Sequence, residues 1–157
     1  MIPWLVEHGV SAVIISPAYG DAAATLAVLD AANTPTLQVF RTLEREGGTF
    51  PLLAPDYLTG GRLAAEHLLE QGCKKIAFLG GLEGRPVTRE RMAGYLSVLE
   101  EAGKDPLILT GQSTRAFGKS MAAQLRKDHP DADGNLCLNA LVALGAVGAR
   151  PRRRGLA

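Results

Sequence analysis

Two arginines near a glycine-containing loop have the chemistry to bind an anion or a sugar hydroxyl. The loop runs from Gly80 to Val87 and contains Arg85, and Arg91 follows in a predicted helix. If Thr88 caps this helix, Arg91 falls in its first turn, where the helix dipole disfavours a cation. A helical side chain leans back toward the N-terminus, so Arg91 would reach over the loop. Two guanidiniums there would suit a carboxylate, a phosphate or a sugar hydroxyl. For Arg85, a solvated surface position is an equally good interpretation.

The loop lies between a predicted strand and a predicted helix. Ile76 to Leu79 is an apolar run of strand length, and two glycines end it. The apolar residues that follow have the spacing of one helix face, and Gly103 suits the end of that helix. They are Met92, Tyr95, Leu96, Leu99 and Ala102.

The rest of the chain alternates in the same way. We expect helices over 2–8, 22–32, 57–71, 114–128 and 140–149, and strands over 10–15, 36–40, 50–54, 106–109 and 135–138. Asp56 is the expected N-cap of the third of these helices. Such alternation predicts an α/β fold with parallel, doubly wound sheets and helices on both faces.

Ligands of such folds bind beyond the carboxyl ends of the strands. The residues at those ends therefore form the candidate binding surface, although most of them would only shape loops. The candidate ligand-binding residues are Tyr19, Phe40, Asp56, Arg85, Arg91 and Asn139.

Composition excludes several classes of protein. Hydrophobic residues make up 46% of the 157 and charged residues 21%, which is typical of a globular protein. Four arginines lie in 150–157, and removing them would turn the net charge of +1 into −3, so the body of the chain has no nucleic-acid footprint. We find no membrane span and no secretory signal at the N-terminus. Cys73 and Cys137 lack metal-site or redox-motif spacing, which favours reduced thiols in the cytoplasm.

No arrangement of residues points to catalysis. The glycines in Gly80-Gly81-x-x-Gly84 do not have dinucleotide-binding spacing, and no lysine-serine pair follows them. Among the three histidines we find no Ser/His/Asp order, paired acid or metal-ligand cluster. The sequence therefore indicates no catalytic residue, no metal and no cofactor, and a phosphate- or nucleotide-using enzyme is the weakest alternative.

Several motifs, in order, resemble the effector-binding region of lactose/galactose repressor (LacI/GalR) family regulators over roughly residues 5 to 148. They are Gly-Val-Ser-Ala-Val-Ile-Ile-Ser (9–16), Asp56-x-x-x-Gly60-x-x-x-Ala64-x-x-His67-Leu68, the stretch 72–81, Arg91-x-x-Gly94-Tyr95 and Asn139-x-Leu-Val-Ala-Leu-Gly145.

The resemblance implies a periplasmic-binding-protein-like type I fold with two incomplete lobes. It places residues 1–41 in a partial first lobe, 42–49 in a crossover linker, 50–149 in a partial second lobe and 150–157 in a disordered basic tail. In such regulators the arginine of the R-x-x-G-[YFW] motif contacts the effector, which here is Arg91. The asparagine before the second-lobe helix also contacts it, which here is Asn139, and Arg85 lies near a loop position that does so in some relatives.

The sequence also departs from the family. Nothing resembles the helix-turn-helix headpiece, Ala140 stands where an aspartate is usual, and residues 148–157 leave the family pattern. We therefore expect a chain truncated at both ends, with a frameshifted tail. The implied partners are a small polar effector (a sugar or a nucleobase), operator DNA through a domain missing here, and a homodimer partner. A sugar-transport solute-binding protein of the same fold is the alternative function.

Overall fold

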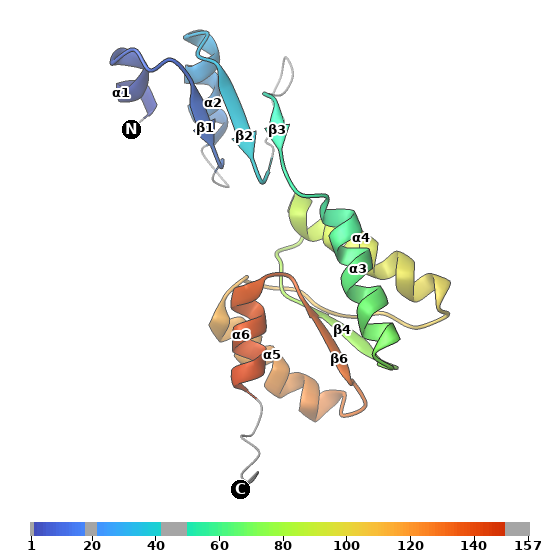
Figure 1. Cartoon of the computed structure of the whole chain (residues 1–157). Helices are drawn as coiled ribbons and strands as arrows, with labels where there is room; N and C mark the ends of the chain where they lie inside the picture. Colours follow the sequence, from blue (N-terminus) through green and yellow to red (C-terminus); the bar gives the residue numbers. More distant parts are fainter. Residues whose placement is uncertain (1, 18–21, 42–49, 150–157) are drawn as a thin grey trace, which may run out of the picture. The chain divides into compact units, whose positions relative to one another are not determined.

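A computed structural model describes residues 2–17, 22–41 and 50–149 of the chain (Figure 1). The chain forms two compact units, Met1–Pro55 and Asp56–Ala157. Among the described residues, helices and strands alternate except that the strand at 52–53 follows the strand at 36–39 directly, and each strand pairing in the two sheets is parallel. The predicted α/β class and the parallel pairing are confirmed.

The first unit contains a three-stranded sheet in the order β1-β2-β3. Its elements are α1 (Ile2–Glu7), β1 (Val13–Ile15), α2 (Ala22–Ala31), β2 (Thr36–Val39) and β3 (Leu52–Leu53). Leu26 and Leu29 of α2 are fully buried, as is Gln38 of β2. Ile14, which is paired with Leu37, is 72% exposed, so apolar side chains of this sheet remain accessible to solvent.

Residues 50–54, which the sequence analysis assigns to the second lobe, belong to the first unit of the structure. The Gln38 amide donates to the Pro51 carbonyl (2.8 Å) and the Phe40 amide donates to the Leu53 carbonyl (2.9 Å). These bonds make β3 the third strand of the first sheet, and the second unit starts at Asp56. The polar composition of 42–49 marks a connection, but it does not reveal which elements are connected. Those eight residues and the tail 150–157 lie outside the described part of the chain.

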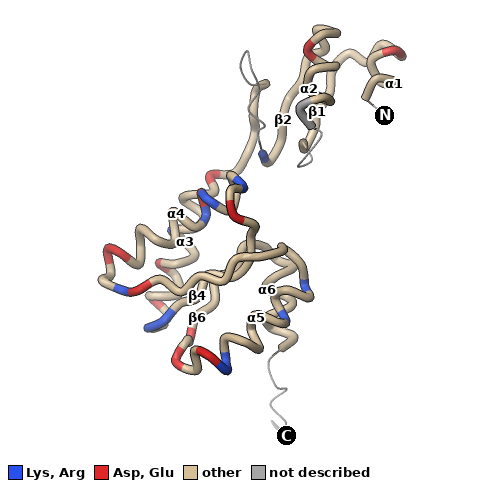
Figure 2. The backbone as a smooth tube through the Cα atoms, turned by 180° about the vertical axis from the view of Figure 1, so that it is seen from behind, with Lys and Arg blue, Asp and Glu red and all other residues tan. Residues whose placement is uncertain are grey.

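The second unit has a sheet in the order β5-β4-β6, with β4 in the centre. Its elements are α3 (Tyr57–Glu70), β4 (Ile76–Leu79), α4 (Pro86–Glu101), β5 (Leu107–Leu109), α5 (Arg115–Asp128), β6 (Gly134–Cys137) and α6 (Ala140–Gly148). All four residues of β4 are buried. Neither β4 nor β6 contains a charged residue, and the charges lie on helices and loops (Figure 2).

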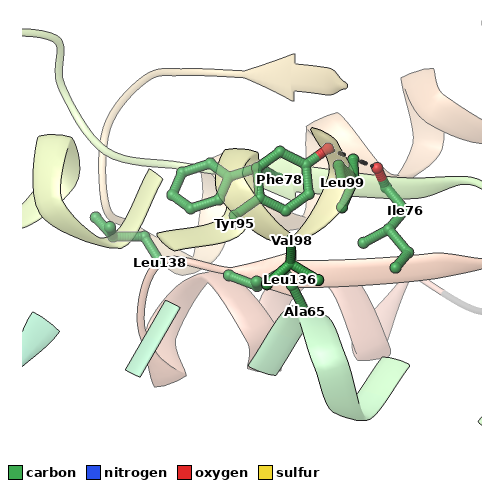
Figure 3. Packing of buried hydrophobic residues seen from close by; sticks show 8 residues of the cluster. All are labelled: Ala65, Ile76, Phe78, Tyr95, Val98, Leu99, Leu136 and Leu138. Atoms are coloured by element: carbon green, nitrogen blue, oxygen red, sulfur yellow. Dashed lines mark hydrogen bonds between the residues drawn. The ribbon is translucent and has the colours of Figure 1, made fainter. Parts of the chain in front are cut away.

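Helices cover both faces of this sheet, as predicted. Ile76 and Phe78 point toward α3 and α4, where they pack with Tyr95 and Leu99 (Figure 3). The alternate residues of β4 pack in a second cluster with α5 and α6. The buried Tyr95 hydroxyl donates to the Ile76 carbonyl (2.8 Å) and accepts from the Leu107 amide (3.1 Å), so this polar group is satisfied in the core.

Glycines allow the helices on each face to cross closely. A Cβ added to Gly61 of α3 would lie 2.2 Å from the Arg91 carbonyl oxygen, and one added to Gly94 of α4 would lie 2.1 Å from that of Leu58. On the other face, Gly118 of α5 and Gly145 of α6 make equally close approaches, each to a carbonyl of the opposite helix. The backbone of α4 that carries Arg91 is therefore fixed against α3.

The start of α4 differs from the prediction. The helix begins at Pro86, with Arg85 at the N-cap position, rather than after Thr88. Proline suits the first helical position because its φ is already helical and its missing N–H is not needed there. Thr88 is buried and lies against Gly81, whose φ of +88° puts it in the left-handed region and where a Cβ would come within 2.6 Å of Thr88. Arg91 is thus in the second turn, and the predicted conflict with the helix dipole does not arise.

Candidate functional site

A groove of about 530 Å³ in the second unit runs along β6 to its carboxyl end and the start of α6. The N-terminal half of α3, Arg91 of α4, strand β6 and the start of α6 line it. Its lining residues are Gly60, Gly61, Ala64, Arg91, Asn135, Leu136, Cys137, Leu138, Asn139, Ala140 and Ala143. Arg91 and Asn139, which are 48 positions apart in the sequence, are therefore brought to one rim.

The structure holds the guanidinium of Arg91 at the wall of this groove. Its Nη1 donates a hydrogen bond to the backbone carbonyl of Leu138, the last residue before Asn139. Its Cζ lies 4.9 Å from the ring centroid of Tyr57, a cation–π contact. The side chain is partly buried. Arg91 is thus a positioned cation, rather than one that moves freely on the surface.

Asn139 has a structural role as well as a place in the groove. It is the N-cap of α6, and its side-chain Oδ1 accepts the Val142 amide (3.0 Å). Because the oxygen is engaged, the Nδ2 amide is the polar group that Asn139 can offer to a ligand. Arg91 and Asn139 together supply hydrogen-bond donors, which suits a ligand rich in acceptor oxygens.

The other residues that line the groove are mostly small and weakly polar. Ala64, Ala140 and Ala143 leave room against the backbone of β6. Burial raises the pKa of the Cys137 thiol, so Cys137 is a protonated wall residue rather than an activated nucleophile. Both cysteines are free thiols, as predicted. The arrangement can bind a polar molecule, and it contains no activated nucleophile.

The other predicted site residues do not line this groove. Asp56 is the N-cap of α3, where its carboxylate accepts from the amide (2.8 Å) and hydroxyl (2.8 Å) of Thr59. The backbone hydrogen bond from Thr59 lowers the pKa of Asp56. Arg85 is the N-cap of α4. Phe40 belongs to the first unit, is 58% exposed and has a φ of +68°, and Tyr19 lies outside the described residues.

Sequence reasoning missed three parts of the site. Tyr57 was passed over because it was counted only as the first residue of a helix. Gly61 is an unspecified position in the motif that contains Gly60, although its close contact with α4 sets the position of Arg91. The Leu138 carbonyl could not be found from a side-chain pattern. An aromatic residue directly after the capping Asp56 was the one available signal for Tyr57.

Within 2–17, 22–41 and 50–149, no group of three or more His, Cys, Asp or Glu residues could hold a metal ion. None of the helices in these ranges combines the length and apolar character that crossing a membrane requires.

Parallel α/β sheets, with a donor-lined groove at a strand's carboxyl end, define a ligand-binding protein of the α/β class. A family model described as periplasmic binding proteins and sugar binding domain of LacI family matches residues 2–154. The chain belongs to this family, and the resemblance to LacI-type regulators is confirmed.

The individual relatives include a repressor and a transport binding protein. The chain is 34% identical over 99 residues to the ribose operon repressor of Halalkalibacterium halodurans, a match that covers 63% of this chain and 30% of the repressor. It is 31% identical over 153 residues to the ribose import binding protein of Bacillus subtilis, covering 92% and 48%. The chain thus spans less than half the length of either relative.

A solved structure shows the same fold. The periplasmic solute-binding protein of an ABC transporter from Actinobacillus succinogenes, with bound D-allose, superposes with a TM-score of 0.84 at 22% identity. The match covers 94% of this chain and 56% of that protein. The predicted periplasmic-binding-protein-like architecture, present in part, is confirmed.

Proposed function

We propose that this chain is the sugar-effector-binding region of a LacI-type transcriptional regulator and that Arg91 and Asn139 contact the effector. The observation that carries the proposal is that both residues line one groove beside β6 and the start of α6. Both offer N–H donors, and a sugar presents hydroxyl oxygens that accept them. A sugar is the class of effector that we propose. D-ribose is the first sugar to test, because two of the relatives are named for it.

The mechanism is binding rather than chemistry. An effector that prefers one arrangement of a two-unit protein shifts the population toward that arrangement. In a regulator this shift would change the affinity of a separate DNA-binding domain for operator DNA. Operator DNA, a homodimer partner and a cytoplasmic location belong to this proposal, and a nucleobase is the alternative to a sugar as the effector.

A sugar-transport solute-binding protein is the second candidate. The observation in its favour is the match to the ribose import binding protein, which extends over 153 residues, against 99 for the ribose operon repressor. Genomic DNA upstream of the first codon would distinguish the two. A helix-turn-helix coding sequence in any frame supports the regulator, whereas a secretory leader would favour the transport protein.

Binding is tested by saturation-transfer NMR with D-ribose as the probe. The chain should bind the sugar, and Arg91→Met should weaken binding by at least about tenfold, because hydrogen bonds to a charged donor are lost. Arg89→Met is the matched control, since Arg89 is exposed on the same helix and does not line the groove.

Arg89→Met should bind as the parent does. Equal affinities of the parent and Arg91→Met for D-ribose would remove Arg91 from the site. Absence of any saturation transfer from the parent protein to D-ribose would reject D-ribose as the ligand.

A further inference from the structure

The ring of Tyr57 supports the guanidinium of Arg91 from the side of α3. Tyr57 is 9% exposed, which is unusual for the first residue of a helix whose preceding residue, Asp56, is exposed. The distance of 4.9 Å between the Arg91 Cζ and the ring centroid is within the range of a cation–π contact. The buried ring at this point therefore has an electrostatic partner in Arg91.

The start of α3 fixes where this ring lies. Asp56 caps the helix through two hydrogen bonds to Thr59, both 2.8 Å, so Tyr57 is held as the first helical residue. One turn later, Gly61 lets the Arg91 backbone approach α3 to a distance that no other residue would allow. The cap and the glycine together place the ring of α3 beside the cation of α4.

Three contacts then restrain Arg91: its backbone against Gly61, its Nη1 on the Leu138 carbonyl and its plane beside Tyr57. Among the described residues its side chain makes one hydrogen bond, so most of the five N–H donors of a guanidinium remain for a ligand. A side chain that is already ordered loses less conformational entropy when a ligand binds. The benefit is large for a long side chain such as arginine, which has many rotamers to lose.

We infer that Tyr57 is a positioning residue of the binding site, whose ring holds the Arg91 guanidinium ready for a ligand with paired oxygens. Adjacent hydroxyls of a sugar and the two oxygens of a carboxylate both match the fork of the guanidinium. The inference rests on the proposed function for the sugar, but the arrangement of Tyr57 and Arg91 can be tested without it. The aromatic ring is the part of Tyr57 that makes the cation–π contact.

The test compares Tyr57→Phe, which keeps the ring, with Tyr57→Leu, which keeps an apolar side chain without a ring. With D-ribose as the probe, Tyr57→Phe should bind within about twofold of the parent. Tyr57→Leu should raise the Kd by about five- to thirtyfold. In an Arg91→Met background, Tyr57→Leu should cause no further loss, which a purely structural role of Tyr57 would not predict. Equal Kd values for Tyr57→Phe and Tyr57→Leu, at equal thermal stability, would overturn the inference.

A second readout needs no ligand. The ring current of Tyr57 should shift the Arg91 side-chain proton resonances upfield in the parent and in Tyr57→Phe, and the shift should vanish in Tyr57→Leu. If the shifts are present but D-ribose does not bind, the proposed sugar is wrong and the positioning of Arg91 stands. If D-ribose binds but the Arg91 resonances are the same in all three proteins, Tyr57 does not hold the guanidinium and the inference fails.

Discussion

The two sheets of this protein have the same parallel pairing but differ in how well they are covered. In the second unit, β4 is buried at every position, with a helix pair on each face. In the first, Ile14 of β1 and Leu53 of β3 are 72% and 65% exposed. A sheet with two covered faces can fix side chains at its carboxyl end, whereas a sheet with an open face cannot do so to the same degree. The candidate site accordingly lies on the second sheet.

The largest expected difference is in the response of the two sheets to truncation. Phe78→Ala should reduce the free energy of unfolding by about 3–5 kcal/mol, because Phe78 is fully buried in the core of the second unit. Ile14→Ala, the matched change in the first sheet, should stay within about 0.5 kcal/mol. Urea unfolding followed by far-UV circular dichroism measures both. Similar losses would mean that the first sheet is covered in solution, as it would be by a second copy of the chain.

The next difference tests the helix crossing that positions Arg91. Gly61→Ala should destabilise the protein by about 1–3 kcal/mol, since the added Cβ would lie 2.2 Å from the Arg91 carbonyl oxygen. Gly60→Ala, one residue earlier, has nothing within 4 Å and should stabilise by about 0.5–1 kcal/mol. Thermal unfolding of the two variants provides the measurement. Opposite signs are the expected result, and a neutral Gly61→Ala would show that α3 and α4 are not in close contact.

A smaller loss is expected from the polar group in the core of the second unit. Tyr95→Phe removes the hydroxyl that bonds both the Ile76 carbonyl and the Leu107 amide. The cost should be about 1.5 kcal/mol, the price of leaving buried backbone groups unpaired. Urea unfolding gives the value. A variant as stable as the parent would show that water replaces the hydroxyl.

The smallest expected effect is a pH dependence of the stability of the second unit, and it arises just before β4 and β6 begin. The backbone amides of Lys74 and Lys75 lower the pKa of Asp133. The folded state therefore favours the carboxylate, and this contribution is complete above about pH 4 and is lost as the pH falls through the lowered pKa. Asp133→Asn should flatten the decrease of the urea midpoint between pH 5 and about pH 2. A slope in Asp133→Asn that equals the slope of the parent would contradict this prediction.

Much of the second unit could be predicted from the sequence. Apolar runs and helical spacing identified β4 and its flanking helices, because a sheet buried on both faces requires strongly patterned residues. Asp56 was predicted as the cap of α3 for a similar local reason, whereas Thr114, the cap of α5, was counted as the first residue of that helix. Asn139 and Arg91 were placed at the same rim because parallel topology brings strand ends together.

The rest depends on contacts between distant segments. The pairing of β3 with β2 is formed by only two residues, so the local pattern around Leu52 did not reveal the sheet to which it belongs. The early start of α4 followed from Pro86, which outweighed the capping tendency of Thr88. The contact between Tyr57 and Arg91 depends on the distance between two helices, which the glycine contacts set and which no short motif records.

The central claim is that the groove of the second unit is where a sugar binds. A titration of the ¹⁵N-labelled chain with D-ribose, followed by amide chemical-shift changes, tests it most directly. The largest changes are expected at Gly60, Gly61, Leu138 and Asn139, with the Arg91 side-chain N–H groups shifting as well. Changes confined to the first unit, around the cavity lined by Ile14 and Leu37, would contradict the account.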